Sequence, residues 1–283
     1  MKVLTFDIED WFHILDNPST KEIDQWKKFE SRLSLSVDRI LNALEDRDQK
    51  ATFFILGWVA EQHPEVVHRI IDSGHEIGTH SYGHQLAYNQ SRQEFGEDLG
   101  KSIAILENIS GEKVKAYRAP GFSIVKNNTW AFEILVENGI EVDSSIFPAN
   151  RSHGGLPDFE SSEPCIGSVF NKELKLFPIN SKSFLGRSFI YSGGGYFRLF
   201  PEKFLRYCFS HDDYIMTYFH PRDFDPEQPV LEGLNFLRRF KSYVGLNGAL
   251  AKLELILDEN EFVSLDKAVD TVDWTSVKKY QFK

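Results

Sequence analysis

Residues 51–84 read ATFFILGWVAEQHPEVVHRIIDSGHEIGTHSYGH and switch between two hydrophobic patterns. Ala51–Leu56 is a continuous apolar run with the length of a buried strand. Apolar residues then recur at helical spacing between 66 and 71, Gly74 is suited to end that helix, and 76–78 predicts a short strand. The order strand, helix, strand is typical of a parallel sheet covered by helices.

The same alternation continues on both sides of this stretch. A strand is expected at 3–6 and a helix through 37–44, and Ser91 with Glu94 forms the capping-box pattern of another helix. Further strands are expected at 116–118, 140–143 and 214–219, and further helices around 130–135 and 201–208. A chain of 283 residues with this rhythm has the size of one α/β barrel.

One segment, residues 147–200, breaks the rhythm. It is rich in Gly, Ser and Pro and contains the run Ser192–Gly195. We expect an irregular insertion there, with some β-structure, that covers one end of the sheet. Since neither a repeat nor a linker interrupts the rest, the sequence predicts a single domain over residues 1–283.

Charge and composition exclude several classes of partner. The net charge of −10 argues against nucleic acid or an anionic membrane surface as the main partner. No apolar run approaches the roughly 18 residues of a transmembrane helix, and no signal peptide is recognisable at the start. Cys165 and Cys208 have no metal-site spacing and are expected to be buried thiols. We therefore expect a cytoplasmic protein.

His80 and His84 are the first candidates for chemistry. Two histidines four residues apart fall on one face of a helical turn and can bind one metal ion. The pair alone is weak evidence in a chain with nine histidines, but it directly follows a strand end. Carboxylates that could complete such a site follow the first strand: Asp7, Glu9 and Asp10.

Other polar residues also stand at predicted strand ends. Arg118 could hold a carboxylate through two hydrogen bonds, and Gly121 would let a backbone N–H approach a ligand closely. His220 is a natural proton donor near neutral pH, and Asp143 could orient it. Taken singly, a surface arginine and a structural histidine are the commoner interpretations.

As an ordered set, these residues resemble the polysaccharide deacetylase family, the NodB-homology group also known as carbohydrate esterase family 4. The stretch 51–84 is similar to the second motif region of the family over its whole length. YRAPGFSI, VDSSIFP, GGGYFRLFP and YFHPRDFDP resemble a subgroup associated with bacterial exopolysaccharide and surface glycans. The resemblance covers roughly Lys2 to Leu265.

The resemblance implies a distorted (β/α) barrel that binds one divalent metal ion, usually Zn²⁺. His80 and His84 would be ligands of that ion, and Asp7 would be the general base, held by Arg118. His220 would be the general acid, supported by Asp143. The Gly121 N–H would stabilise the oxyanion together with the metal.

The sequence departs from the common family wording in ways that affect the site. Ile8 separates Asp7 from the next acid, so the third metal ligand is either Glu9, which strand alternation places on the face of Asp7, or Asp10, which a bend after Ile8 would favour. Pro221-Arg222-Asp223 replaces a usual Pro-Trp-Glu. Four residues are expected to line the substrate groove: Phe122, Gly194, Tyr196 and Arg198.

The expected activity is hydrolysis of the N-acetyl group of an amino sugar in a surface glycan or its precursor. A deformylase or another C–N amide hydrolase on the same fold is an alternative. A catalytically silent glycan-binding scaffold is the alternative from another class, although such a scaffold has no physical need for three acids and an HxxxH motif together.

Overall fold

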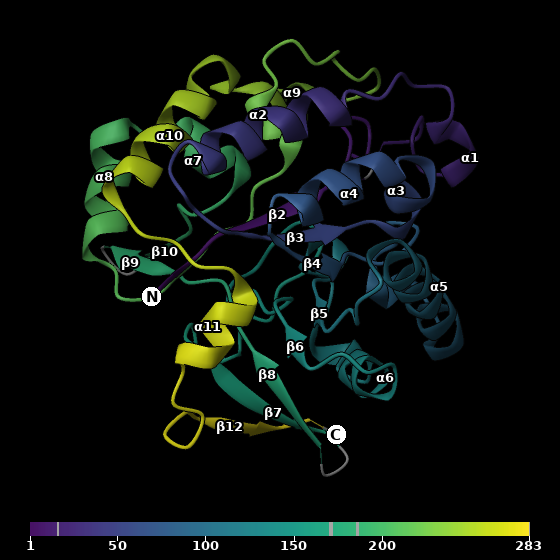
Figure 1. The fold of residues 1–283 in the computed structure, drawn as a ribbon. Coiled ribbons are helices and arrows are strands. Elements are labelled where there is room, and N and C mark those ends of the chain that lie inside the picture. The colour runs from purple at the N-terminus through teal and green to yellow at the C-terminus, as the bar shows by residue number, and fades with distance from the viewer. Residues whose placement is uncertain (16, 170–171, 185–186, 283) are drawn as a thin grey trace.

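The protein is an α/β structure with helices packed around a mostly parallel sheet (Figure 1). The computed structural model describes residues 1–15, 17–169, 172–184 and 187–282. The strands are β1 (Lys2–Val3), β2 (Thr5–Ile8), β3 (Thr52–Ile55), β4 (Glu76–Thr79), β5 (Ala116–Tyr117), β6 (Val142–Asp143), β7 (Cys165–Val169), β8 (Lys172–Leu176), β9 (Lys182–Phe184), β10 (Arg187–Phe189), β11 (Ile215–Met216) and β12 (Lys279–Gln281).

The α-helices lie mainly between the strands, as the sequence rhythm predicts. They are α1 (Ile23–Trp26), α2 (Leu33–Glu45), α3 (Gly57–Gln62), α4 (Pro64–Asp72), α5 (Arg92–Ser110), α6 (Ala131–Glu137), α7 (Gly194–Leu199), α8 (Glu202–His211), α9 (Phe236–Tyr243), α10 (Ala249–Glu259) and α11 (Leu265–Thr271). Short 3₁₀ turns within the described residues are η1 (Ala87–Asn89), η2 (Pro120–Phe122), η3 (Lys126–Asn128), η4 (Pro221–Phe224) and η5 (Leu246–Gly248). The capping box expected at Ser91 is confirmed, with the Ser91 side chain accepting from the Glu94 N–H.

The main sheet has the order β12-β7-β8-β6-β5-β4-β3-β2. From β2 to β8 all neighbours are parallel, whereas β7 runs antiparallel to β8. At the β2 edge, β1 pairs with β11 and a further bridge joins Phe6 to Phe219. The α/β fold with a parallel sheet is confirmed, and the strand pairings among the described residues do not close that sheet into a barrel.

The expectation of an insertion at 147–200 is wrong for part of that segment. Residues 165–169 and 172–176 are strands of the main sheet, and β8 extends the parallel order beside β6. The remainder is irregular, with the β9–β10 hairpin and the short α7. The sequence pattern does not reveal these two strands as members of the main sheet, because no helix separates β7 from β8 along the chain.

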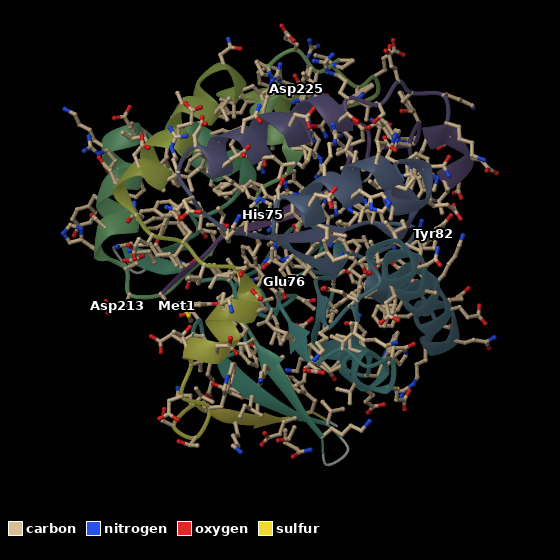
Figure 2. All side chains as sticks on the ribbon, in the orientation of Figure 1. Met1, His75, Glu76, Tyr82, Asp213 and Asp225 are labelled. Carbon is tan, nitrogen blue, oxygen red and sulfur yellow. The ribbon has the colours of Figure 1, made fainter. Side chains whose placement is uncertain are left out.

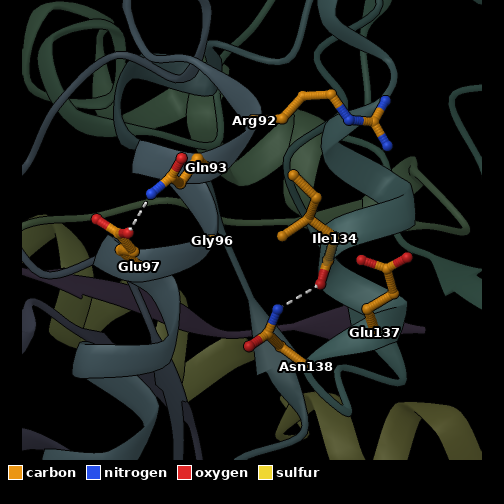
Figure 3. A pocket seen from close by; sticks show the side chains of 7 residues that line it. All are labelled: Arg92, Gln93, Gly96, Glu97, Ile134, Glu137 and Asn138. Atoms are coloured by element: carbon orange, nitrogen blue, oxygen red, sulfur yellow. Dashed lines mark hydrogen bonds between the residues drawn. The ribbon is translucent and has the colours of Figure 1, made fainter.

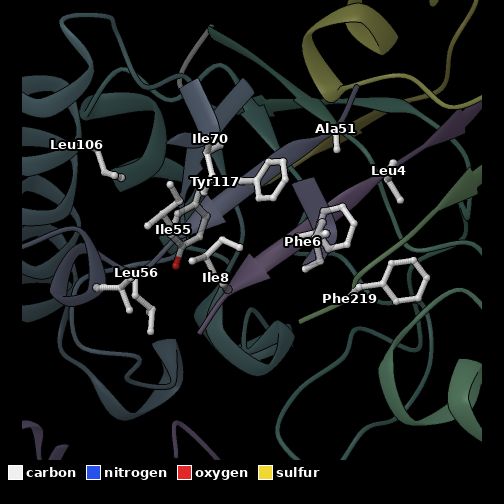
Figure 4. Packing of buried hydrophobic residues seen from close by; sticks show 14 of the residues in the cluster. Leu4, Phe6, Ile8, Ala51, Ile55, Leu56, Ile70, Leu106, Tyr117 and Phe219 are labelled. Carbon is white, nitrogen blue, oxygen red and sulfur yellow. The ribbon is translucent and has the colours of Figure 1, made fainter. Parts of the chain in front are cut away.

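Both faces of β2 and β3 are buried, which explains their continuous apolar runs. Phe6 and Ile55 belong to the main hydrophobic core cluster (Figure 4). Phe53 belongs to the same cluster, and its ring stacks on that of Phe6 with a centroid distance of 5.1 Å. Phe54, one residue after Phe53, points to the other face of the sheet, into a second cluster that includes Met216. Strand alternation also turns Asp7, which pairs in register with Phe54, towards this face.

The C-terminal part of the chain is tied to the N-terminal part by polar contacts. The carboxylate of Asp225, labelled in Figure 2, accepts from Arg32 at 2.5 Å and from Arg39 at 2.9 Å, which links the loop after η4 to α2. The Met1 amino group donates to the Asp213 carbonyl. Among the described residues, no helix is long and apolar enough to cross a membrane.

Candidate metal and acid-base site

Glu9, His80 and His84 converge at the carboxyl ends of β2 and β4. Glu9 Oε1 lies 3.1 Å from His80 Nε2 and 2.9 Å from His84 Nε2, and the three side chains are buried. Their potential ligand atoms all lie within 4.8 Å of one another. Burial by itself would raise the pKa of Glu9, but His84 and His220 and the hydrogen bonds from His80 and His84 hold that pKa well below its usual range.

The tautomer of His80 is fixed by its second ring nitrogen. His80 Nδ1 lies 2.7 Å from the Arg118 carbonyl oxygen, which can only accept, so Nδ1 carries a proton. In neutral His80 the lone pair of Nε2 then faces the Glu9 carboxylate. That arrangement is repulsive unless a cation lies between the two groups, and a carbonyl-held imidazole is the usual second contact of a metal-binding histidine. The donor set therefore fits a divalent ion.

The backbone that presents the two histidines differs from the expected helical turn. Residues 80–84 form an irregular loop in which Ser81 has φ +67° and His84 has φ +52°. These left-handed residues rule out a continuous helix. The loop is held by Asp98, which accepts from the backbone N–H groups of Tyr82 and Gly83. The spacing brought the rings together, but through a different local structure.

Asp10 does not join the cluster. Its Oδ1 accepts from the N–H of Trp11 at 2.8 Å and from that of Arg32 at 3.3 Å, so it holds the loop that leads into α2. Burial raises its pKa. Of the two acids left open by the sequence, Glu9 meets the histidines. It does so from a turn rather than from the strand, because β2 ends at Ile8 and the Glu9 N–H donates to the Asp7 carbonyl at 3.0 Å.

Asp7 and Arg118 form a buried ion pair beside Glu9. Arg118 Nη1 lies 2.7 Å from Asp7 Oδ1 and also donates to Thr5 Oγ1, and its Nη2 donates to Ser144 Oγ at 2.8 Å. Arg118 has no exposed surface and its guanidinium lies 4.4 Å from the centre of the Phe54 ring. The second Asp7 oxygen, Oδ2, lies 3.9 Å from His220 Nε2. One Asp7 oxygen is therefore fixed while the other faces the site.

His220 pairs with Asp223. His220 Nδ1 lies 3.2 Å from Asp223 Oδ2, while His220 Nε2 is 3.8 Å from Glu9 Oε1. Burial by itself would lower the imidazole pKa, but Glu9, Asp223 and Asp7 outweigh it and raise the pKa of His220 to about 9. Asp223 in turn lies 3.0 Å from Arg198 Nε, and despite burial this guanidinium and His220 lower its pKa to about 2.

The expected support of His220 by Asp143 is therefore wrong. Asp143 accepts from the backbone N–H of Ser145 at 3.0 Å and from its hydroxyl at 2.6 Å. Ser145 Oγ in turn accepts from the Ala119 N–H, so Asp143 braces the backbone after Arg118. The reason is positional: β6 lies between β5 and β8 in the main sheet, whereas His220 follows β11, which pairs with β1 in a separate two-stranded sheet.

Asp143 makes stability depend on pH. Burial raises the pKa of its carboxyl from 3.8 to about 7. Between pH 4 and pH 7 the unfolded chain ionises Asp143 while the folded chain keeps the proton, so its contribution to the unfolding free energy falls as pH rises, by roughly 4 kcal/mol. Asp143→Asn removes the ionisable group and with it this loss of stability. Between pH 4 and pH 7 the unfolding free energy of the variant, relative to that of the wild type, should therefore rise by roughly 4 kcal/mol.

Urea unfolding of both proteins at pH 4, 5.5 and 7 measures this difference. The exposed Asp270→Asn controls for the change in net charge. The lost hydrogen bond to Ser145 adds a term that does not change with pH. A difference that stays constant from pH 4 to pH 7 would show that the folded protein ionises Asp143 as easily as the unfolded chain does.

Gly121 adopts φ +60° in the turn that follows β5. A Cβ there would lie 2.9 Å from Leu15 Cδ1, 3.1 Å from His153 Cβ and 3.1 Å from Leu86 Cδ2. Only glycine fits this crowded left-handed position. Position 121 is therefore restricted to glycine, and the expected role of its N–H towards an oxyanion stays a prediction.

The four residues expected to line a substrate groove have different surroundings. Tyr196 is about half exposed and Gly194 lies beside Asp223. Phe122 and Arg198 are buried, which contradicts the expectation for both. Positive φ at Phe122 turns its ring against Phe147 and Tyr218. The Arg198 guanidinium pairs with the Asp223 carboxylate. It also donates to the backbone carbonyls of Lys241, Ser242 and Val244.

A shallow hollow lies away from these residues, between α5 and α6 (Figure 3). Its walls carry Gln93 and Glu97, which hydrogen-bond to each other, and Asn138, which donates to the Ile134 carbonyl. It contains none of the strand-end residues. The chemistry of the molecule is therefore concentrated at the Glu9–His80–His84 cluster.

Sequence reasoning missed Asp223 and Ser145 as parts of the site. Asp223 had a detectable signal, because a carboxylate three residues after His220, beyond a proline, can turn back on the imidazole. The structure confirms that the Asp223 carboxylate turns back on His220, because Asp223 Oδ2 also accepts from the His220 backbone N–H at 2.9 Å. Ser145 had no signal beyond its place after a strand.

Two sequence families match the chain. Residues 15–142 match the family described as polysaccharide deacetylase, and residues 144–270 match a domain of unknown function, DUF3473. The two segments share one sheet through the pairing of β6 with β8. The site draws on both segments and on the residues before them: Asp7 and Glu9 precede the first match, and His220 lies in the second.

Known proteins resemble parts of the chain. A Bacillus cereus peptidoglycan-N-acetylglucosamine deacetylase is 38% identical over 96 residues, which are 34% of this chain and 35% of that protein. The Listeria monocytogenes peptidoglycan-N-acetylglucosamine deacetylase PgdA is 42% identical over 81 residues, 29% of this chain and 17% of that protein. The first of these alignments thus spans about a third of its relative.

The fold has a solved counterpart. A Mycobacterium smegmatis crystal structure assigned to the polysaccharide deacetylases superposes with a TM-score of 0.67 at 18% identity, covering 99% of this chain and 92% of that one. This likeness concerns the fold, including the part that follows residue 142.

Proposed function

Because residues 15–142 match the polysaccharide deacetylase family, we propose that the protein hydrolyses the N-acetyl group of an amino sugar in a surface glycan or its precursor. The observation that carries the proposal is the convergence of three buried groups: the Glu9–His80–His84 cluster, the Asp7–Arg118 pair and the His220–Asp223 pair. The relatives named as N-acetylglucosamine deacetylases support an N-acetylated hexosamine as the reacting unit.

Glu9, His80 and His84 would hold one divalent ion, and two imidazoles with one carboxylate suit Zn²⁺ while leaving positions open. When bound, such an ion supplies Lewis acidity and makes water more acidic.

The chain's own groups divide the proton transfers. Asp7, with one oxygen held by Arg118, accepts a proton from the attacking water as its oxygen bonds to the amide carbon. The Gly121 N–H donates to the carbonyl oxygen as it gains negative charge. His220, kept protonated by its carboxylate neighbours, gives its proton to the amide nitrogen, the C–N bond breaks, and acetate and the free amine leave.

The test is release of acetate from N-acetylglucosamine oligomers by the purified protein with added Zn²⁺. A parallel assay with N-formylated oligomers, read as formate, separates the deformylase alternative. Acetate release with formation of one free amine per acetate supports the proposal. No turnover of either substrate by protein that contains one equivalent of metal would favour the silent scaffold.

His220→Ala should slow deacetylation by about 10²–10⁴-fold without loss of the metal, because it removes a general acid that is not part of the cluster. The measurement pairs initial rates with the metal content of the same sample. The exposed His68→Ala is the matched control. Unchanged turnover in His220→Ala would remove His220 from the mechanism.

A further inference from the structure

Helix α9 exposes its apolar residues. Phe236 is 86% exposed, Leu237 60% and Phe240 48%, and the helix contains no buried residue. Positions 236, 237 and 240 lie on one side of a helix. A surface helix normally turns such a stripe towards the core, so the apolar side of α9 is not what attaches it to the protein.

Polar contacts attach α9 instead. Arg238 Nη2 donates to the Leu15 carbonyl at 2.8 Å, and Tyr243 Oη accepts from the Leu231 N–H at 2.8 Å. The buried Arg198 donates to the carbonyls of Ser242, at 3.1 Å, and Val244, at 2.8 Å. The inner side of α9 is therefore fixed by directed hydrogen bonds, and the apolar stripe is left free on a positioned helix.

The surroundings of the stripe are basic. Arg239 and Lys241 are exposed, and helical spacing places them on opposite flanks of Phe240. Residues 233–253 include Arg238, Arg239, Lys241 and Lys252 and no acidic residue, in a chain whose net charge is −10. The charge of this segment is thus opposite to that of the molecule as a whole.

We propose that α9 docks the protein on an anionic membrane surface. Phe236, Leu237 and Phe240 enter the boundary between headgroups and acyl chains, and Arg239 and Lys241 bind the lipid phosphates on either side. An apolar stripe flanked by cations is the pattern of helices that lie in the interface plane. The remaining acidic surface is repelled, which leaves the α9 side as the one that approaches the membrane.

A second copy of the chain fits this surface less well. In a two-fold contact through α9 the same patch meets itself, so Arg239 and Lys241 of both copies would be brought together. Like charges brought together oppose such an interface. An anionic lipid surface satisfies the apolar stripe and both flanks at once.

Docking through α9 would also set the orientation of the site. Arg238 Nη1 donates to His153 Nε2 at 2.9 Å, and His153 packs beside Gly121. The helix is therefore joined to the loop that borders the candidate oxyanion position. Membrane binding does not depend on the proposed deacetylation, so each can fail without the other.

The experiment is sedimentation of the full chain with phosphatidylcholine vesicles that do or do not contain phosphatidylglycerol. Wild type should bind the phosphatidylglycerol vesicles only, and binding should weaken with salt. Arg239→Glu/Lys241→Glu and Phe236→Ser/Leu237→Ser should each weaken binding by at least about tenfold. Their controls are Lys126→Glu/Lys267→Glu, with the same change in charge, and Leu35→Ser/Tyr207→Ser, which removes exposed apolar groups elsewhere.

Absence of binding to either vesicle would overturn the proposal, as would equal loss in the control variants. Equal binding to both vesicles would show that the basic flanks are not the recognition element. A concentration-dependent dimer that the α9 variants abolish would assign the surface to a second copy. Circular dichroism of every variant verifies that it is folded.

Discussion

His80→Ala/His84→Ala is expected to lose the metal ion and all measurable activity. Only Glu9 of the three converging groups would remain, and one carboxylate does not hold a transition metal in competition with water. Even loss of an outer contact to a ligand costs about 10–100-fold in metal affinity, so loss of two ligands should exceed that range. Mass spectrometry of the metal in purified protein, beside acetate release, measures both effects.

The control for this variant is His68→Ala, which removes an exposed imidazole from α4. It should retain one equivalent of metal. Glu9→Gln is a sharper companion, because it keeps the shape of the side chain while removing the charge that faces both imidazoles. Tight stoichiometric metal in the double alanine variant would show that the ion binds elsewhere.

Arg118→Leu is expected to destabilise the protein by about 3–5 kcal/mol, because it leaves Asp7 buried without its partner. In a chain of this size that corresponds to a fall in Tm of roughly 5–8 °C. The surface pair of Lys115 with Glu141 is the comparison: Lys115→Leu removes one partner of a pair in which both side chains are more than half exposed, and it should cost about 1 kcal/mol or less.

A double-mutant cycle separates the ion pair from the other contacts of Arg118. Asp7→Asn/Arg118→Leu should be less destabilised than the sum of the two single variants by more than about 1 kcal/mol, since the second change removes the charge that the first left unpaired. Contacts of Arg118 with Thr5 and Ser144 are lost in both backgrounds and cancel. Additive effects would mean that Arg118 acts as a structural donor rather than as the partner of Asp7.

Strand and helix positions were largely predictable, because buried strands and amphipathic helices leave their period in the sequence. β3 lies within Ala51–Leu56 and α2 covers the expected 37–44. β7 and β8 were not predicted as strands of the main sheet because they form an antiparallel pair with no helix between them in the sequence. The strand-helix-strand pattern that indicates parallel strands is therefore missing there. The prediction of a helical turn at residues 80–84 was wrong for a local reason. The spacing of the two histidines does not reveal that Ser81 and His84 adopt positive φ.

Net charge was a poor guide to local surfaces. The total of −10 argued against an anionic membrane, yet residues 233–253 carry only basic groups. Whether such a stretch matters depends on which side of α9 faces out. Arg198 and Arg238 decide that by binding the inner side, and both contacts join residues more than 40 positions apart in the chain.

The sequence by itself determined most of the elements, the alternation that turns Asp7 to the same side as Phe54, and the residue types of an acid, base and metal site. These properties are local, because they follow from backbone periods of two and 3.6 residues and from side-chain chemistry. Tertiary structure alone decided which groups pair: Asp223 rather than Asp143 with His220, Glu9 rather than Asp10 with the histidines, and Arg198 with Asp223 instead of a substrate. Pairing depends on sheet order and on which strand ends become neighbours, and contacts between distant segments set both.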